Sequence, residues 1–275
     1  MSETILPLAL LKVTGEDHVN FLQGQLTQDM NLTENQWSFA AQCNPQGRVI
    51  AFFMTFVRNG STFLITDKES SDQAIEQLKK YVMRSKVSFE LCAESIYFNC
   101  SSNTHDLNNN SDEAINLVSQ DQESIILQHF TGAYYCSQSE PENCSDALQW
   151  RKSQINAGIP FLTNKALNKF TPESINLDLL NAVNFNKGCY TGQEIVARMH
   201  YLGKAKKRLF KVKIEGKLDN IKISDNITES EGKTIGHLVD FVNTGEALIT
   251  LKTSNENLLH KSQHTIKSIN GELLL

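Results

Sequence analysis

The 275-residue chain carries its densest group of reactive side chains in one run, Asn186-Lys187-Gly188-Cys189-Tyr190-Thr191-Gly192-Gln193-Glu194-Ile195-Val196-Ala197-Arg198. A thiol, an ammonium, a guanidinium, a carboxylate and two glycines lie within it. A segment that served packing alone would carry fewer polar groups. The run therefore predicts a functional site, and the rest of the chain is interpreted around it.

The thiol of Cys189 is the first candidate for chemistry in this run. Residues 193–200 are expected to form a short helix, so the thiol precedes a helix N-terminus, with Lys187 and Arg198 nearby in sequence. A helix N-terminus and neighbouring cations both favour the thiolate, which is the reactive form. We therefore predict a functional Cys189 assisted by Lys187 and Arg198; its role as nucleophile, cluster ligand or redox sensor stays open.

A cysteine protease would need a histidine and an orienting amide beside the thiol. His200 and His237 are present, but no spacing supports either, so this alternative is disfavoured. His105 and His129 have no periodic partners and are expected to be surface or lightly buried residues without a role.

Composition narrows the class of protein. The net charge is −5 and 40% of the residues are hydrophobic, which suits a globular chain and disfavours non-specific DNA binding. Neither a signal peptide nor a membrane-spanning run is recognisable, so we expect a cytoplasmic protein. The six cysteines form no Cys-x-x-Cys pair, and no metal site is predicted.

The first hundred residues show the pattern of an α+β unit. A capped helix should begin at Thr14-Gly15-Glu16-Asp17, and Asn59-Gly60 is typical of a type I′ hairpin turn. Gly24, inside the first helix, suggests another backbone or a ligand close by. The other expected elements are strands at 6–13, 49–57, 62–66 and 87–91, and a helix at 70–83.

The remaining chain predicts a second α+β unit and a barrel. Residues 101–146 are polar and variable, and Asp146 should cap a helix that carries Trp150 and ends before Gly158. Short strands follow Arg208, at 209–214, 217–223, 233–242, 247–251 and 264–269, as in an antiparallel β-barrel. We expect a region 1–205 of two α+β subdomains, divided near 95–105, and a C-terminal domain 206–275.

The strongest basic cluster lies where these regions meet, from Lys204 to Lys213. It could bind an acidic ligand tail or an RNA phosphate run, or it could be the solvated face of a strand. Both alternatives stay open, and so does the question of whether the protein binds tRNA directly.

The run from Lys187 to Arg198 resembles the signature of the YgfZ family, folate-binding relatives of the glycine-cleavage T-protein, an aminomethyltransferase. Other segments resemble the family in the same order: residues 21–29, 40–48, 80–81, 85–87 and 157–160, and Trp150. The resemblance covers nearly the whole chain and is weakest between 101 and 146.

The resemblance implies an α+β fold in which two ferredoxin-like units and a C-terminal antiparallel β-barrel form a ring around a central channel. It implies binding of tetrahydrofolate or a one-carbon derivative, and a monomer that helps assemble or repair iron–sulfur proteins such as tRNA-thiolating enzymes, thereby supporting tRNA modification indirectly. Whether the chain is itself a one-carbon transferase stays open. The alternative is an aminomethyltransferase acting on a lipoyl-protein with tetrahydrofolate.

The resemblance also assigns cofactor-binding positions. Trp150 matches an aromatic residue that lies against the folate, and the motif residues Tyr190, Gln193 and Glu194 complete the assigned site. Two positions depart from the family: Leu8 replaces a tryptophan found in at least one relative, and Asn156 replaces an acid able to pair with the pterin's amino edge. Glu173 also stands where relatives often carry glutamine.

Overall fold

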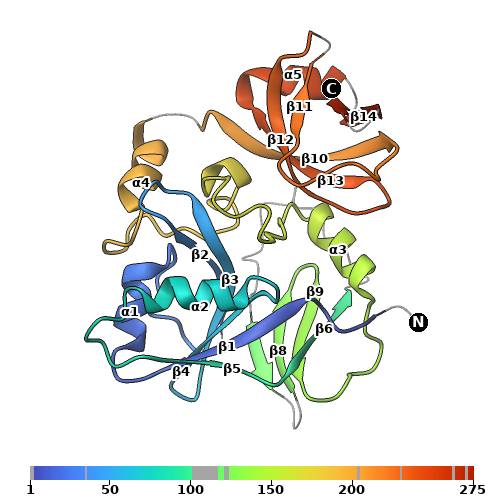
Figure 1. Ribbon diagram of the computed structural model, residues 1–275. Coiled ribbons are helices and arrows are strands. Elements are labelled where there is room, and N and C mark those ends of the chain that lie inside the picture. The colour runs from blue at the N-terminus through green and yellow to red at the C-terminus, as the bar shows by residue number, and fades with distance from the viewer. Residues whose placement is uncertain are drawn as a thin grey trace.

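The computed structural model describes residues 3–34, 36–100, 117–120, 124–202, 205–229, 231–261, 264–269 and 272–275. His105, Gly203 and Lys204 lie outside these residues. Three sheet-based units are joined by a linking segment, residues 157–202, which begins between them and ends in a helix at the edge of the molecule beside β2 (Figure 1). No helix in the described part of the chain is long and apolar enough to cross a membrane.

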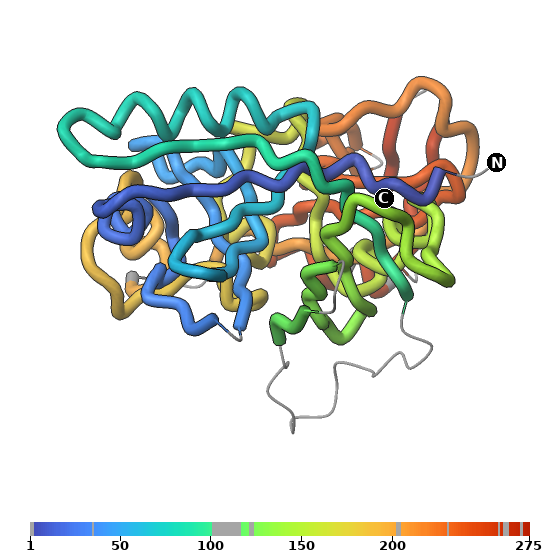
Figure 2. The backbone as a smooth tube through the Cα atoms, turned by 90° about the horizontal axis from the view of Figure 1, so that it is seen from below, coloured from blue at the N-terminus to red at the C-terminus, as the bar shows by residue number. Residues whose placement is uncertain are grey.

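The first unit is a five-stranded sheet in the order β2-β3-β4-β1-β5 with two helices. Its elements are β1 (Leu8–Thr14), α1 (His18–Gln25), β2 (Trp37–Cys43), β3 (Val49–Arg58), β4 (Ser61–Asp67), α2 (Ser71–Lys79) and β5 (Ser88–Leu91). Figure 2 shows α2 running along β1 and β5. Phe53 of β3 packs with Leu22 and Leu78 on the helical side, and Met54 faces the larger core. β3 is therefore buried on both faces, as its sequence predicted.

Two local predictions in this unit need correction. Thr14 does not cap α1: Asp17 occupies the N-cap position and makes no side-chain capping bond, because its carboxylate accepts instead from the Lys86 N–H at 2.7 Å. The expected helix at 70–83 ends at Lys79 and gives way to turns that include Met83 at φ +44°. The type I′ turn is confirmed, with φ +47° at Asn59 and +67° at Gly60.

The second unit is a four-stranded sheet in the order β6-β9-β8-β7, with one helix. Its elements are β6 (Ser95–Cys100), β7 (Leu117–Gln120), β8 (Ser124–His129), β9 (Gly132–Ser137) and α3 (Ala147–Asn156). Asp146 and Gln149 form a reciprocal capping box, so the predicted helix start is confirmed. The Trp37 indole N–H donates to the Gln128 carbonyl at 2.8 Å and joins the second unit to the first.

The third unit is a closed barrel in the order β10-β13-β12-β11-β15-β14. Its elements are β10 (Lys207–Gly216), β11 (Asn226–Thr228), β12 (Thr234–Phe241), β13 (Glu246–Lys252), α5 (Glu256–Lys261), β14 (Thr265–Ile269) and β15 (Glu272–Leu274). The barrel was predicted, but the β10–β14 and β11–β15 pairs are parallel. The expected strand at 217–223 is wrong: Leu218 and Ile221 pack into the barrel core from a turn, and pairing begins at Asn226.

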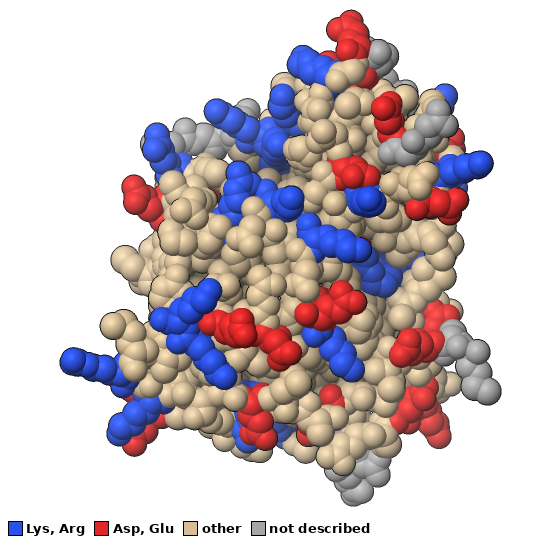
Figure 3. Space-filling model, in the orientation of Figure 1, with Lys and Arg blue, Asp and Glu red and all other residues tan. Residues whose placement is uncertain are grey.

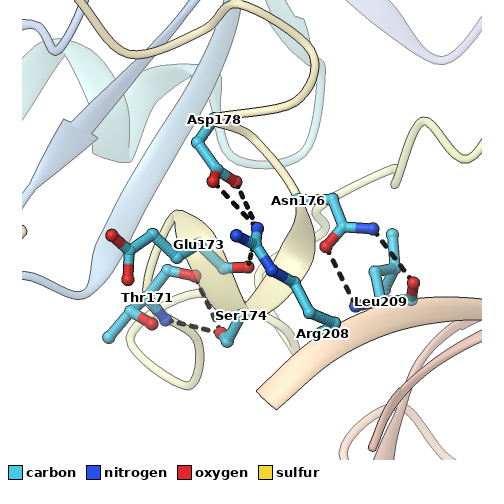
Figure 4. A network of polar contacts seen from close by, with 7 residues as sticks. All are labelled: Thr171, Glu173, Ser174, Asn176, Asp178, Arg208 and Leu209. Atoms are coloured by element: carbon cyan, nitrogen blue, oxygen red, sulfur yellow. Dashed lines mark hydrogen bonds and ion pairs between the residues drawn. The ribbon is translucent and has the colours of Figure 1, made fainter. Parts of the chain in front are cut away.

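The linking segment fastens the units to one another. It contains the short helix η1 (Glu173–Ile175) and α4 (Gln193–Leu202). Arg208 of β10 donates to both carboxylate oxygens of Asp178 at 2.7 and 2.9 Å (Figure 4). From the second unit, Arg151 forms a bidentate pair with the buried Asp240 of β12. These contacts hold the barrel against the linking segment and the second unit.

Candidate functional site

Two glycines bring the run 186–198 against the turn that follows β2. Gly192 has φ +85°, and a Cβ there would lie 2.4 Å from the Asn44 carbonyl oxygen. A Cβ on Gly47, which has φ +69°, would lie 2.9 Å from the Ile195 Cβ. Only residues without a side chain allow this approach. Two motifs that stand about 145 residues apart therefore share one surface.

Lys187 anchors the run to the end of α1. Its ammonium donates to the carbonyls of Gln23, Leu26 and Gln28 at 2.7, 2.7 and 2.8 Å. These carbonyls belong to the last turn of α1 and its exit, where main-chain acceptors lack intrahelical donors. Burial lowers the pKa of Lys187 to about 8, against the raising effect of the Asp29 carboxylate. The side chain thus remains largely charged at neutral pH and holds the loop in place.

The remaining residues of the run divide between the interior and the surface. Tyr190 is buried, with the Lys187 ammonium 5.3 Å from its ring centroid, and burial raises the pKa of its phenol. Cys189 is a free, exposed thiol. Half-buried Gln193 and exposed Glu194 form the first turn of α4. The Gly24 carbonyl accepts from the Thr191 N–H at 3.3 Å, so a backbone neighbour is present, but a Cβ on Gly24 would meet no atom within 4 Å and the approach does not require a glycine.

A cavity of about 600 Å³, called here the central cavity, lies where all three units meet. Its lining comprises Gln28, Ser38, Phe39, His129, Phe130, Asn156, Ala157, Gly158, Asn176, Leu179, Leu180, Asn181 and Lys211. Aromatic rings and amides dominate this set, which holds no aspartate or glutamate. The volume falls within the usual range for small-molecule sites, roughly 300–1,000 Å³. A flat ring with a polar edge fits this lining.

Gln28 connects the run 186–198 with the central cavity. A second cavity, of about 560 Å³, is lined by Asn186, the first residue of the run, and by His200. It shares Gln28 and Asn181 with the central cavity. The Gln28 side-chain amide donates to the Asn181 carbonyl. Lys187, which binds the Gln28 main chain, therefore lies directly behind the wall that the two cavities share.

His129 is a cavity residue that the sequence interpretation missed. It lies against Phe130 and Trp37, with ring centroids 4.0 and 5.3 Å away, and lines the central cavity. Burial lowers the pKa of His129 to about 3, so the imidazole is neutral at physiological pH. Trp37 and Phe39 come from a strand far from His129 in sequence, and no periodic pattern could have revealed these contacts.

Trp150 and Leu8 lie together, but at a different cavity from Asn156. Trp150 is 3% exposed, and its indole N–H donates to the Tyr134 hydroxyl at 3.3 Å. With Leu8 it borders an apolar cavity of about 50 Å³. Phe39 belongs to the linings of both this cavity and the central one. The structure thus brings Leu8 and Trp150 to one side of Phe39, and Asn156 to the cavity on its other side.

Arg198 lines a different cavity from the rest of the predicted site. It is exposed on α4 and lines a third cavity of about 740 Å³, together with Arg48, Lys169, Lys206, Lys207 and His237. Among the hydrogen bonds of the described residues, none joins the Cys189 thiol to His200 or His237. The histidine partner that a cysteine protease requires is thus missing from the described site.

The basic cluster divides into two parts. Lys206 and Lys207 line the third cavity. Farther along β10, Lys211 and Lys213 are exposed and alternate with the buried Val212 and Ile214, as expected of a solvated strand face, and Lys211 also lines the central cavity. Lys204 lies outside the described residues.

Comparisons with known proteins identify relatives of this chain. No family model matches the chain. An uncharacterized protein of Haemophilus influenzae is 30% identical over 97% of this chain and 92% of its own length. The tRNA-modifying protein YgfZ of Klebsiella pneumoniae is 31% identical over 74% of this chain and 68% of its own length.

The fold also matches a solved structure. The crystal structure of the glycine cleavage system aminomethyltransferase T from Bartonella henselae superposes with a TM-score of 0.66 over 91% of this chain and 77% of that one, at 11% identity. The three units therefore adopt the aminomethyltransferase fold. Because a YgfZ relative exceeds 30% identity over two thirds of its length, the chain belongs to the YgfZ family.

Proposed function

We propose that the protein binds tetrahydrofolate or a one-carbon derivative in the central cavity and serves as an accessory factor for the assembly or repair of iron–sulfur proteins. Its support of tRNA modification is then indirect, through tRNA-thiolating enzymes that carry such clusters. The observation that carries the proposal is the cavity of about 600 Å³, which is walled by rings and amides from both α+β units and the linking segment and by Lys211 from the barrel. The membership in the YgfZ family supports the same reading.

The cavity residues have separate roles in this proposal. Phe39 and Phe130 would contact the faces of the pterin or benzoyl ring, and the Asn156 amide would meet its polar edge. Lys211, whose ammonium donates to the Asn156 carbonyl at 3.4 Å, would lie at the same polar edge of the ring. Trp150 and Leu8 line the neighbouring apolar cavity, which shares Phe39 with the central cavity. When bound, the folate supplies a carrier for a one-carbon unit.

In this proposal, Cys189 is the residue that acts on the partner protein or on the cluster. Cys189 is exposed, whereas Cys43 and Cys136 are buried and have thiol pKa values raised by burial. Cys189 is thus open to a partner protein or a cluster, and Lys187 and Tyr190 hold its loop. Arg198, Gln193 and Glu194 follow on α4, the element that continues this surface.

Filling the cavity tests the folate site. Ala157, half-buried at the cavity wall, can be replaced by phenylalanine. Ala157→Phe should weaken tetrahydrofolate binding at least about tenfold, equivalent to about 1.4 kcal/mol. The exposed Ala93 gives the control, Ala93→Phe, which should bind like the wild type. Equal affinity of all three proteins would place the folate elsewhere.

Replacing the thiol tests the iron–sulfur role. Cys189→Ser should fold normally and fail to restore iron–sulfur enzyme activity in cells that lack their own YgfZ protein. Cys144→Ser is the matched control, because a hydroxyl can keep the bond that this thiol donates to the Pro141 carbonyl. Full restoration by Cys189→Ser would refute the functional thiol.

The fold favours one second candidate, an aminomethyltransferase acting on a lipoyl-protein. The lining of the central cavity offers no carboxylate among its described residues, which disfavours this reading. Transfer of a methylene group from an aminomethyl-lipoyl donor to tetrahydrofolate by the purified protein would establish the second candidate over the first.

A further inference from the structure

The third cavity, called here the basic cavity, is a concentration of positive charge in an acidic chain. Its six basic residues are Arg48, Lys169, Arg198, Lys206, Lys207 and His237, and its volume is about 740 Å³. They come from the turn after β2, the linking segment, α4, the start of β10 and β12. On the face shown in Figure 3, blue side chains gather over the junction between α4 and the barrel.

The lysines and arginines of this set are not neutralised by the protein, whereas His237, with its pKa lowered, is uncharged at neutral pH. In the part of the chain that the structure describes, none of them forms an ion pair with a carboxylate. The pKa of Lys207 is lowered by burial and then by the charges of Lys252 and Arg48. The pKa of His237 is lowered by burial and then by Lys207 and Lys169. Like charges held together in this way favour an anionic ligand.

A buried carboxyl group forms part of the same cavity wall. Glu173 is 2% exposed, and its Oε2 atom has no hydrogen-bond partner. The nearby Arg208 guanidinium binds the Glu173 main-chain carbonyl and the Asp178 carboxylate, and the Glu173 side chain extends away from it (Figure 4). Burial, followed by Asp178, raises the pKa of Glu173 to about 7, while Arg208 lowers it.

An unpartnered buried carboxyl is costly unless a ligand supplies its partner. Nucleobases offer amino and imino N–H groups that pair with carboxylates. Phosphates pair with arginine and lysine. Phe170, Ile195 and Met199 add apolar wall on which a base can lie. Oligoglutamate would space its negative charges farther apart than a phosphate chain does, and it has no ring to place on this wall.

We propose that the basic cavity binds a nucleoside phosphate, with the phosphates on Lys169 and Lys206 and the base edge at Glu173. The ligand is a free nucleotide or the terminal nucleotide of an RNA strand, which share this chemistry. The basic cavity has no lining residue in common with the central cavity, so this site is separate from the proposed folate site.

Calorimetric titration of the full-length protein tests the site, with ATP, GTP, a 5′-phosphorylated RNA octamer, inorganic triphosphate and γ-pentaglutamate as probes. The double variant Lys169→Gln, Lys206→Gln should bind the nucleotide probes at least about tenfold more weakly, since each lost phosphate contact weakens binding. Lys213→Gln is the control: this lysine is exposed on the same strand as Lys207 but lines none of the cavities. It should bind like the wild type.

A second variant tests the base edge. Glu173→Leu should weaken ATP or GTP binding and leave inorganic triphosphate binding unchanged. Tighter binding of ATP or GTP than of RNA identifies a free nucleotide; tighter RNA binding that falls steeply with salt identifies an RNA end. The proposal is overturned if no nucleotide probe binds, if pentaglutamate alone binds, or if the double variant matches the wild type. Tetrahydrofolate titrated into the double variant should bind normally, which separates this result from the folate proposal.

Discussion

The Lys187 ammonium lies 2.8 Å from the main-chain oxygen of Gln28, whose side chain lines the central cavity. One residue therefore links the loop that bears Cys189 to the wall of the proposed folate site. Movement of the loop and occupation of the cavity are expected to affect each other through Gln28.

Lys187→Met should destabilise the protein, because three carbonyls lose their charged donor. Hydrogen bonds to charged groups contribute about 1.5–3 kcal/mol each and are not additive, so we expect a loss of roughly 2–4 kcal/mol in the free energy of unfolding. Urea denaturation measures this loss. Lys213→Met, on an exposed strand face, should change the free energy by less than about 0.5 kcal/mol. Similar values for the two variants would contradict the anchoring role.

Gly192→Ala should disrupt the contact between the motif and the turn after β2. The new Cβ would lie 2.4 Å from the Asn44 oxygen at φ +85°. Strain at such a position costs about 1–3 kcal/mol. Gly188→Ala, in the same run, meets no atom within 4 Å and should be nearly neutral. Thermal unfolding of the pair gives the answer, and equal melting temperatures would show that the approach is not required.

Asn156→Asp should strengthen folate binding. A carboxylate accepts from the amino edge of a pterin more strongly than a neutral amide does, and a gain of about 1.4 kcal/mol corresponds to about tenfold in Kd. Trp37, which lies against the cavity residues Phe39 and His129, provides a fluorescence signal for the titration. Asn143→Asp, at an exposed turn, is the control. Unchanged affinity in Asn156→Asp would remove residue 156 from the pterin edge.

Glu173→Gln should change how stability depends on pH. The pKa of Glu173 is raised from 4.5 to about 7 in the folded protein. Between these values the folded state binds more protons than the unfolded state, so this group makes stability fall as pH rises from about 4.5 to about 7. Besides burial, the Asp178 carboxylate raises this pKa and the Arg208 guanidinium lowers it.

The stability gained by Glu173→Gln should therefore be larger at pH 8 than at pH 5, as measured by urea unfolding at both. Asp178 keeps its pairing with Arg208 in this variant, which isolates the contribution of residue 173. A difference between variant and wild type that stays constant with pH would show that the carboxyl group titrates normally.

Local chemistry made much of the fold predictable. The Asn59-Gly60 turn and the Asp146 capping box depend on neighbouring residues and are confirmed. The predicted strand at 217–223 is wrong, because Leu218 and Ile221 have the side chains of strand residues but pack into the barrel core from a turn. Propensity cannot separate these two uses of apolar residues.

The site was less accessible to sequence reasoning. The run 186–198 drew attention to Cys189 and the resemblance to Asn156. His129 joins the wall of the central cavity, and the cations gather around Glu173, only after separate units have packed together. Asp17 shows the same limit at small scale, since its bond to Lys86 spans 69 residues and replaces the expected cap. Contacts of this kind depend on topology, which no local pattern encodes.

The most direct measurement is a crystal structure of the protein with tetrahydrofolate. The folate ring should lie in the central cavity, between Phe130 and Asn156. Density for the ligand in the basic cavity, or at the exposed surface with the central cavity empty, would contradict the proposed function.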